Sequence, residues 1–191
     1  VMVHFVGAGP GAPDLITVRG GELIRQADVI VYAGSLVNPA LLDEAKPGCR
    51  VYDSAAMTLE EVIAVLEAAA NQGQTVVRLH TGDPSLYGAV REQMSALTAR
   101  GIPWDVTPGV SAFAAAAATL GAEYTLPGVS QTLILTRMAG RTPVPEGEAI
   151  SSLAAHGASM AVYLSAGLLP GLARELMAGG LPGDTPAALV Y

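Results

Sequence analysis

The sequence is poor in several residue types, and each shortage excludes a class of protein. It has one cysteine in 191 residues, Cys49, so it cannot form an internal disulfide, and no Cys/His cluster has the spacing of metal ligands. Its 10 basic residues against 17 acidic residues give a net charge of −7. Binding of a phosphate backbone needs clustered basic side chains. We therefore expect neither a metal nor a nucleic-acid partner, and the single thiol fits a reducing cytoplasm.

Long hydrophobic runs are also missing. The apolar stretch at residues 112–119 is far shorter than the roughly 20 residues of a spanning helix, so we expect no membrane partner. Residues 1–6 are apolar without a basic region before them, and they predict a first strand instead of a signal peptide. What the chain does have is 51% apolar residues and only 14% charged ones, which predicts a soluble protein with a sizeable core.

Short β-rich runs alternate with helical patterns along the chain. This alternation predicts an α/β fold with a mainly parallel sheet covered on both faces. Asn38 before Pro39, and Thr58 three residues before Glu61, predict the starts of two helices. The predicted strands are residues 3–6, 29–32, 50–52, 75–80, 104–107, 132–136 and 160–164.

The pattern changes after residues 107–109, Thr-Pro-Gly, because Pro-Gly halts both helix and strand. We therefore predict two α/β domains, an N-terminal one over residues 1–108 and a C-terminal one over residues 109–191. Residues 187–190 resemble a strand at which the chain stops, so the second domain is expected to be incomplete at its end.

A first glycine-rich turn follows the first predicted strand. Residues 7–12, Gly-Ala-Gly-Pro-Gly-Ala, nominally fit the dinucleotide-binding fingerprint. A nicotinamide site also needs an acidic residue after the second strand, where this chain has Ala33 and Gly34. Pro10 removes a backbone N–H that such a loop presents to pyrophosphate. An NAD-dependent oxidoreductase stays as a rival of a different class.

A second turn, residues 81–88, follows the fourth predicted strand, at the edge where open α/β sheets bind ligands. Gly82 allows the backbone to approach a ligand closely. Asp83 either accepts hydrogen bonds from a ligand or from nearby amides, or caps a helix that starts near Leu86. A third turn, residues 107–112, leads to Ser111, which either caps the Ala-rich helix that follows or contacts a ligand.

Taken in order, these turns resemble the tetrapyrrole (corrin and porphyrin) methylases, and the resemblance covers essentially the whole chain. It implies two α/β domains of that type with S-adenosylmethionine in the cleft between them, S-adenosylhomocysteine as the product, and a homodimer. The glycine-rich first loop is then not a nucleotide cradle, which explains the missing ribose acid. The matching stretches are residues 6–17, 27–32, 82–84 and 108–112.

The resemblance also implies site residues, which we carry over position by position. A further cofactor contact is expected after Tyr191. No general base is named, because the sulfonium methyl is already activated and alignment with the macrocycle carbon should carry the catalysis. The implied cofactor contacts are Pro10, Thr81, Gly82, Asp83, Leu86, Ser111, Ala112, Met138 and Leu164. The candidate substrate contacts are Gly9, Gly11, Asp14, Tyr87, Arg137 and Arg141.

Within the family, residues 33–37 and 80–89 resemble the members that methylate precorrin-4 at C11 in cobalamin synthesis. Uroporphyrinogen-III methylases carry an Asp at the position of Ala33, and that acid is a proposed proton acceptor in those relatives. Metal-free precorrin-4 and cobalt-precorrin-4 stay open as substrates, and uroporphyrinogen III is a further alternative. A tetrapyrrole binder without catalysis is the remaining rival.

A tetrapyrrole substrate carries several carboxylates, whereas this protein is net negative, so local arginines must orient it. Arg137 and Arg141, in a loop bounded by Gly and Pro, are the first candidates because a guanidinium binds a carboxylate in bidentate fashion. The alternative is that both are solvated loop charges.

Other conspicuous residues have plainer interpretations. His80 is expected to pack or to form a hydrogen bond, and Tyr87 either lines the substrate trough or packs under a helix. Trp104 and Cys49 are expected to fill the core. Met138 either lies against an adenine ring or fills a gap.

Overall fold

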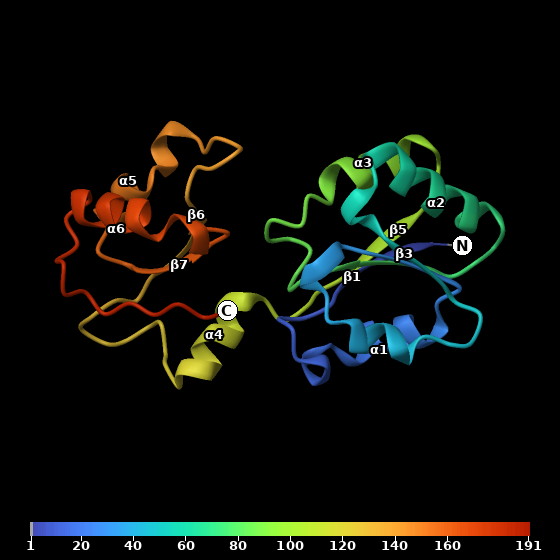
Figure 1. Ribbon diagram of the computed structural model, residues 1–191, viewed down its shortest axis with the longest axis horizontal. Helices are drawn as coiled ribbons and strands as arrows, with labels where there is room; N and C mark the ends of the chain where they lie inside the picture. Colours follow the sequence, from blue (N-terminus) through green and yellow to red (C-terminus); the bar gives the residue numbers. More distant parts are fainter. Residues whose placement is uncertain (1) are drawn as a thin grey trace. The chain divides into compact units, whose positions relative to one another are not determined.

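The computed structural model describes residues 2–191, with the side chain of Ser35 excepted, and the chain forms two compact units (Figure 1). The units are Val1–Ala115 and Ala116–Tyr191. The division falls inside helix α4 (Ala112–Leu120). The domain boundary at residues 108 and 109 stays a prediction.

The first unit is built on a five-stranded sheet in the order β3-β2-β4-β1-β5. Every neighbouring pair is parallel, which confirms the predicted α/β class. β1 lies between β4 and β5, so that Val3 faces Val76 on one side and Trp104 on the other. The strands are β1 (Val3–Gly7), β2 (Val29–Tyr32), β3 (Arg50–Asp53), β4 (Val76–His80) and β5 (Trp104–Thr107).

Helices cover both faces of this sheet (Figure 1). Successive strand residues point to opposite faces. Phe5 thus packs under α2 and α3 with Leu66, whereas Val6 packs on the α1 side with Ile24. The helices are α1 (Val18–Gln26), α2 (Leu59–Asn71) and α3 (Arg91–Ala99), with short 3₁₀ turns η1 (Pro13–Leu15), η2 (Gly34–Leu36), η3 (Pro39–Glu44) and η4 (Ser54–Ala56).

Both predicted helix starts are confirmed. Thr58 and Glu61 form a reciprocal capping box at the start of α2, with Thr58 Oγ1 accepting from Glu61 N and Glu61 Oε2 accepting from Thr58 N. Asn38 caps η3 by accepting a hydrogen bond from Ala40 N, although this element is a 3₁₀ helix and not an α-helix. These caps satisfy amide groups that would otherwise lack a partner.

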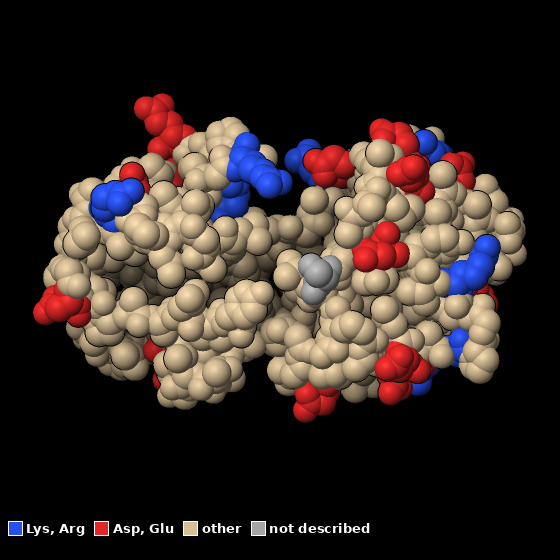
Figure 2. Space-filling model, viewed as in Figure 1, with Lys and Arg blue, Asp and Glu red and all other residues tan. Residues whose placement is uncertain are grey.

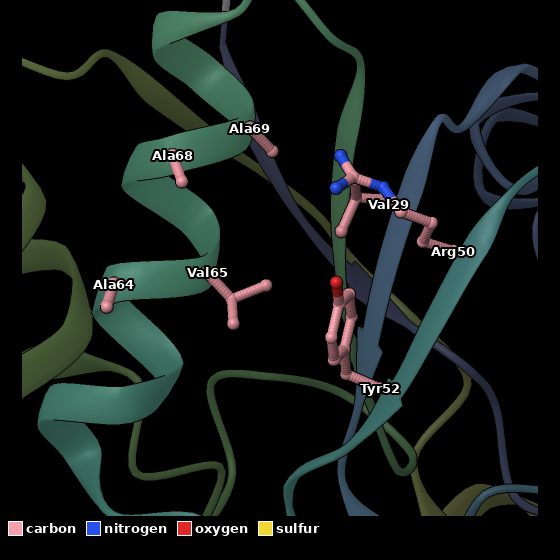
Figure 3. Close-up of a pocket in the computed structure, with 7 residues that line it drawn as sticks. All are labelled: Val29, Arg50, Tyr52, Ala64, Val65, Ala68 and Ala69. Carbon is pink, nitrogen blue, oxygen red and sulfur yellow. The ribbon is translucent and has the colours of Figure 1, made fainter.

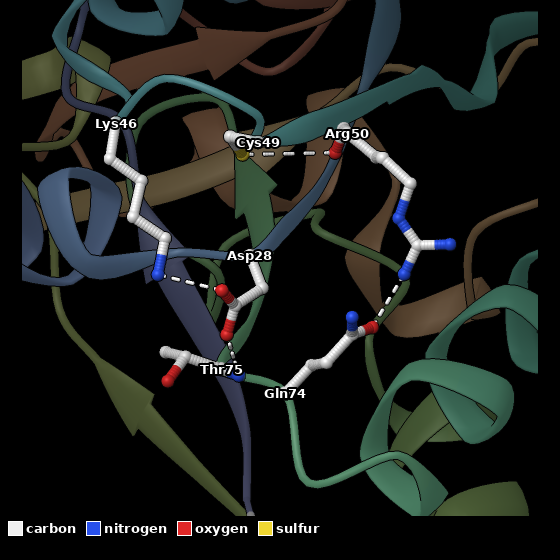
Figure 4. A network of polar contacts seen from close by, with 6 residues as sticks. All are labelled: Asp28, Lys46, Cys49, Arg50, Gln74 and Thr75. Atoms are coloured by element: carbon white, nitrogen blue, oxygen red, sulfur yellow. Dashed lines mark hydrogen bonds and ion pairs between the residues drawn. The ribbon is translucent and has the colours of Figure 1, made fainter.

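Polar contacts connect the amino-terminal ends of three neighbouring strands, β3, β2 and β4 (Figure 4). The carboxylate of Asp28 accepts from Lys46 Nζ at 2.6 Å and from Thr75 N at 2.8 Å. Arg50 donates to Gln74 on the adjoining loop. The starts of β2, β3 and β4 are thereby tied together by hydrogen bonds and one ion pair.

Trp104 does not fill the core, contrary to the sequence prediction. It begins β5, an edge strand, and 36% of it is exposed because no further strand covers that side. Its ring meets Phe5 edge-on, with the centroids 6.3 Å apart, and its Nε1 donates to Thr98 Oγ1. Cys49 is half-buried and packs at the margin of the core layer on the α1 side.

The second unit contains two parallel strands, and the strand predicted at residues 187–190 is wrong. That segment is irregular and Leu189 is 60% exposed. An apolar pattern becomes a strand only where a neighbouring strand supplies hydrogen-bond partners, and none pairs with it in the described chain. The elements are β6 (Leu133–Arg137), β7 (Ser159–Tyr163), α5 (Ile150–Ala154), α6 (Leu169–Ala178), η5 (Glu146–Glu148) and η6 (Ala166–Leu168).

On the face of the first unit that Figure 2 shows, basic side chains are interspersed with acidic ones. Among residues 2–191, no helix combines the length and the apolar character needed to cross a membrane.

Candidate functional site

Three neighbouring strands, β4, β1 and β5, end in glycine turns that pack backbone against backbone. Gly9 and Gly82 exchange hydrogen bonds, with N···O distances of 3.2 and 2.8 Å. A Cβ on Gly7 would lie 2.6 Å from both Gly82 O and Gly109 N, and one on Gly109 would lie 2.1 Å from Gly82 O. Real Cβ atoms never approach this closely, so glycine is required here. The three turns form one continuous backbone surface.

Asp83 links two of these turns. Its Oδ2 accepts from Gly109 N at 2.9 Å, and its Oδ1 accepts from Ser85 N at 2.8 Å and from the Ser85 hydroxyl. Burial raises the pKa of Asp83, but the hydrogen bonds from Ser85 and Gly109 outweigh it and leave the pKa below the ordinary value. The carboxylate therefore stays ionised and joins the second turn to the third.

The predicted helix near Leu86 is absent, so the alternative in which Asp83 caps it is wrong. Residues 84–87 form a turn, and α3 begins at Arg91. Tyr87 and Ala89 instead adopt positive φ angles of 57° and 49°, in the left-handed region that side chains disfavour. Such strain persists only where the surroundings impose it, and it gathers at ligand-binding segments.

The structure brings most of the first-unit candidates to this one edge. Ser111 is buried directly before α4, and its Cα would lie 3.7 Å from a Cβ placed on Gly82. Gly11 is tied down by a 2.8 Å hydrogen bond from Asn38 to its carbonyl. Asp14 lies further along, exposed on η1. Around the glycine turns, Pro10, Thr81 and Leu86 are half-buried, whereas Tyr87 and Ala112 are exposed.

Two further candidates lie at the ends of the strands in the second unit. Leu164 follows β7 with a φ of 56° and is 70% exposed, so an apolar side chain is held in water by a strained backbone. Met138 follows β6, and its backbone N donates to Ser165 Oγ, which donates to Tyr163 O. The Met138 methyl lies 3.1 Å from a Cβ built on Gly171 of α6, so this side chain packs on that helix.

Arg137 holds its own loop together. Its guanidinium donates to the carbonyl groups of Met138, Thr142 and Pro143, at 3.4, 3.2 and 2.8 Å. These bonds use three of its five N–H donors, so Nε and one hydrogen of Nη2 remain for a substrate carboxylate. Arg141 is exposed in the same loop.

The strand before the second turn carries two buried polar residues. His80 packs as expected, since it is buried and stacks on Phe5 with the ring centroids 6.0 Å apart. Burial first, and the charge of Arg78 second, lower the pKa of His80 to about 3, so the ring is neutral. Arg78 was not a sequence candidate, although a lone arginine inside the apolar run of residues 76–79 is a signal of an unusual environment.

A pocket of about 230 Å³ lies between β3 and α2 (Figure 3). Arg50 and Tyr52 point from the edge strand toward Val65 on the helix. Val29 and Arg50, which line it, are the first residues of their strands. None of the residues that line the pocket belongs to the glycine turns.

Comparisons with known proteins agree with this geometry. Residues 2–191 match the family model described as tetrapyrrole (corrin/porphyrin) methylases. The chain is 52% identical to the cobalt-precorrin-4 C(11)-methyltransferase of Methanocaldococcus jannaschii, over 99% of this chain and 73% of that protein. It is 51% identical to the precorrin-4 C(11)-methyltransferase of Pseudomonas aeruginosa, over 99% of this chain and 75% of that protein.

Solved structures give the same result. A cobalt precorrin-4 methyltransferase superposes with a TM-score of 0.91 at 46% identity, over 94% of this chain and 75% of that one. The uroporphyrin-III C-methyltransferase of Thermus thermophilus, complexed with S-adenosylhomocysteine, superposes with a TM-score of 0.77 at 28% identity, over 95% of this chain and 74% of that one. With a matching family model over nearly its full length and relatives at half identity, the chain belongs to the tetrapyrrole methylases.

Proposed function

We propose that this protein transfers the methyl group of S-adenosylmethionine to C11 of precorrin-4, in cobalamin synthesis, and releases S-adenosylhomocysteine. The observation that carries the proposal is the identity of 52% and 51% to two C11-methyltransferases over 99% of the chain. These relatives are named for the cobalt-containing and the metal-free substrate, so the proposal covers both forms. Family membership argues against the NAD-dependent oxidoreductase, and the catalytic relatives argue against a tetrapyrrole binder without activity.

The residues present fit the cofactor. The turns at Gly7, Gly82 and Gly109 pack directly on one another, so they gather the backbone of three strand ends at the edge where open α/β sheets bind ligands. Exposed Leu164 offers an apolar contact. S-adenosylmethionine supplies an activated methyl, and a relative complexed with S-adenosylhomocysteine supports its use. We assign its binding to Pro10, Thr81, Gly82, Asp83, Leu86, Ser111, Ala112, Met138 and Leu164.

The work of the chain's own residues is positioning. Asp83 fixes the second turn against the third through Gly109, which sets the surface on which the cofactor rests. A carbon nucleophile aligned with the methyl then reacts without a nucleophilic side chain, because alignment alone lowers the barrier by several kcal/mol, on the order of 7 to 11 in favourable cases. We assign substrate contacts to Gly9, Gly11, Asp14, Tyr87, Arg137 and Arg141. We further propose a homodimer that works in the cytoplasm.

The test is methyl transfer with three substrates in parallel. The protein is incubated with ¹³C-methyl S-adenosylmethionine and with precorrin-4, cobalt-precorrin-4 or uroporphyrinogen III, and the products are read by mass spectrometry and carbon NMR. One labelled methyl at C11 of either precorrin-4 form is expected. Label only in uroporphyrinogen III would contradict the proposed substrate, and label in none would contradict the activity. Calorimetry with S-adenosylhomocysteine and with NAD, expected to bind and not to bind, tests the cofactor separately.

A further inference from the structure

A cation lies buried inside the sheet of the first unit without an acid beside it. Arg78, in the middle of β4, is 5% exposed. Its Nε donates to Gln93 Oε1 at 2.9 Å and its Nη1 to the Val31 carbonyl at 3.1 Å. Both acceptors are neutral, and in the described part of the chain no carboxylate lies within 4 Å of the guanidinium. Buried charges are normally paired, because an unpaired one is costly.

The charge of Arg78 persists at neutral pH. Burial lowers its pKa to about 10, which still leaves the side chain protonated. His80, two residues further along the same strand face, is neutral and cannot offset it. The fold therefore maintains a positive charge for which it provides no counter-ion.

Arg78 forms part of the wall of a pocket of about 280 Å³. Other walls come from Gln93 and from the first turn of α2, whose dipole favours a negative charge. Ser54 and Thr58, which follow β3, also line it, with the Ser54 hydroxyl donating to the Tyr32 carbonyl and Thr58 Oγ1 accepting from Glu61 N. Complete small ligands occupy pockets of about 300 Å³ or more. This pocket therefore suits one polar arm of a larger molecule and not the whole of it.

We propose that this pocket receives one carboxylate arm of the tetrapyrrole substrate, with Arg78 as its buried counter-ion. The proposal rests on the proposed function, since a tetrapyrrole with several carboxylates is the ligand in question. A guanidinium removed from water binds a carboxylate in bidentate fashion and supplies a local positive charge in a protein whose net charge is −7. Glu92, exposed among the lining residues, is the acid that an incoming carboxylate must pass.

The experiment measures uroporphyrin III affinity by fluorescence titration and S-adenosylhomocysteine affinity by calorimetry. Arg78→Met is expected to weaken uroporphyrin III binding by about 10- to 100-fold, the effect of losing a charged hydrogen-bonded partner, while the affinity for S-adenosylhomocysteine stays unchanged. The matched control is Arg100→Met, which removes the same charge from an exposed pair with Glu67 and should change neither affinity. Uroporphyrin III binding that Arg78→Met leaves intact, or that Arg100→Met weakens equally, overturns the proposal.

A second variant decides the matter if Arg78→Met does not fold. Glu92→Gln removes the acid at the pocket, and it should tighten uroporphyrin III binding by about 1.5- to 5-fold in low salt, with the gain lost in high salt. A carboxylate that binds away from this pocket predicts no such gain, so its absence overturns the proposal, as does a wild-type protein that fails to bind uroporphyrin III.

The two hypotheses fail in different ways. A wild-type protein that binds uroporphyrin III through Arg78 but methylates no tetrapyrrole refutes the proposed function and leaves the carboxylate pocket standing. A protein that methylates precorrin-4 with the same KM after Arg78→Met refutes the pocket alone. The expected result is a raised KM for precorrin-4 and a kcat that changes little.

Discussion

In the five-stranded sheet, the amino-terminal ends of the strands (the amino edge) and their carboxyl-terminal ends (the carboxyl edge) are built in opposite ways. At the amino edge, Asp28 is paired with Lys46 and with the Thr75 amide in ordinary geometry. At the carboxyl edge, the backbones touch so closely at Gly109 that a single methyl group cannot be added. There the backbone also adopts disfavoured angles at Tyr87 and Ala89.

The two edges also differ in their buried polar atoms that lack a hydrogen-bond partner. Among the residues described, His80 Nε2 and Thr107 Oγ1 are buried without a hydrogen-bond partner, and each residue ends its strand at the carboxyl edge. Native proteins tolerate few such groups, and strain gathers where function requires it. The amino edge thus serves stability, whereas the carboxyl edge sacrifices some stability for a surface of bare backbone. Changes at the two edges should therefore have different signatures.

The largest effect is expected from Gly109→Ala. Its Cβ would lie 2.1 Å from Gly82 O, so the second and third turns must separate. We expect a loss of stability of about 3 kcal/mol or more, measured by urea unfolding, and loss of S-adenosylhomocysteine binding in calorimetry. Gly48→Ala, before β3, is the control. Unlike Gly109 it has a positive φ, and no atom lies within 4 Å of the added methyl, so the substitution should cost about 1 to 2 kcal/mol through backbone strain alone and leave binding intact.

Asp83→Ala is expected to have the next largest effect, on binding more than on folding. The variant loses the acceptor for Gly109 N and for Ser85, so the two turns are no longer held together. A charged hydrogen bond contributes about 1.5 to 3 kcal/mol, and we expect S-adenosylhomocysteine affinity to fall by a corresponding factor in calorimetry. Asp83→Asn, which keeps one acceptor oxygen, should lose less. Equal affinity in all three proteins would show that the carboxyl edge does not depend on this link.

His80→Phe tests the unsatisfied groups through pH. The pKa of His80 is about 3 in the folded protein and about 6.5 when unfolded, so between these values only the unfolded state binds the proton. Stability should therefore fall as pH drops below about 6.5, by up to about 1.4 kcal/mol per pH unit from this residue. Phenylalanine keeps the stacking on Phe5 and removes the titration. Urea unfolding across this range should show a flatter slope in the variant, and parallel slopes would refute the assignment.

Lys46→Ala at the amino edge should have the smallest effect. Its ion pair with Asp28 is exposed, and such pairs contribute little. We expect the smallest shift in melting temperature of the four variants and unchanged methyl transfer. A clear drop in S-adenosylhomocysteine affinity would break the contrast between the two edges.

The sequence predicted where the strands lie along the chain, but not which strands lie side by side in the sheet. Residues 29–32 are an apolar run between turns, and β2 has those bounds. The contact of Gly7 with Gly82 and Gly109 depends on pairing between strands distant in sequence, which local patterns do not contain. The resemblance to a family supplied the grouping of these turns, whereas their close packing came only from the structure.

The errors have the same physical origin. The helix predicted near Leu86 and the strand at residues 187–190 were inferred from local composition, and tertiary context overrode both. Arg78 was passed over because a single arginine in a strand is normally read as a side chain facing water. Its burial follows from β4 lying between β1 and β2 under α2 and α3, a property of topology and not of the strand itself.

The central position of β1 sets the order in which the molecule can assemble. β1 precedes both of its partners in the chain, and β4 and β5 are complete only once residues 80 and 107 have been made. Until then an apolar strand with two open edges must be kept apart from other nascent chains. β2 and β3, whose connection covers residues 33–49, can pair earlier. The contact of Gly109 with Gly7 and Gly82 therefore forms only when β5 pairs with β1, so a chain whose synthesis stops before Trp104 lacks it.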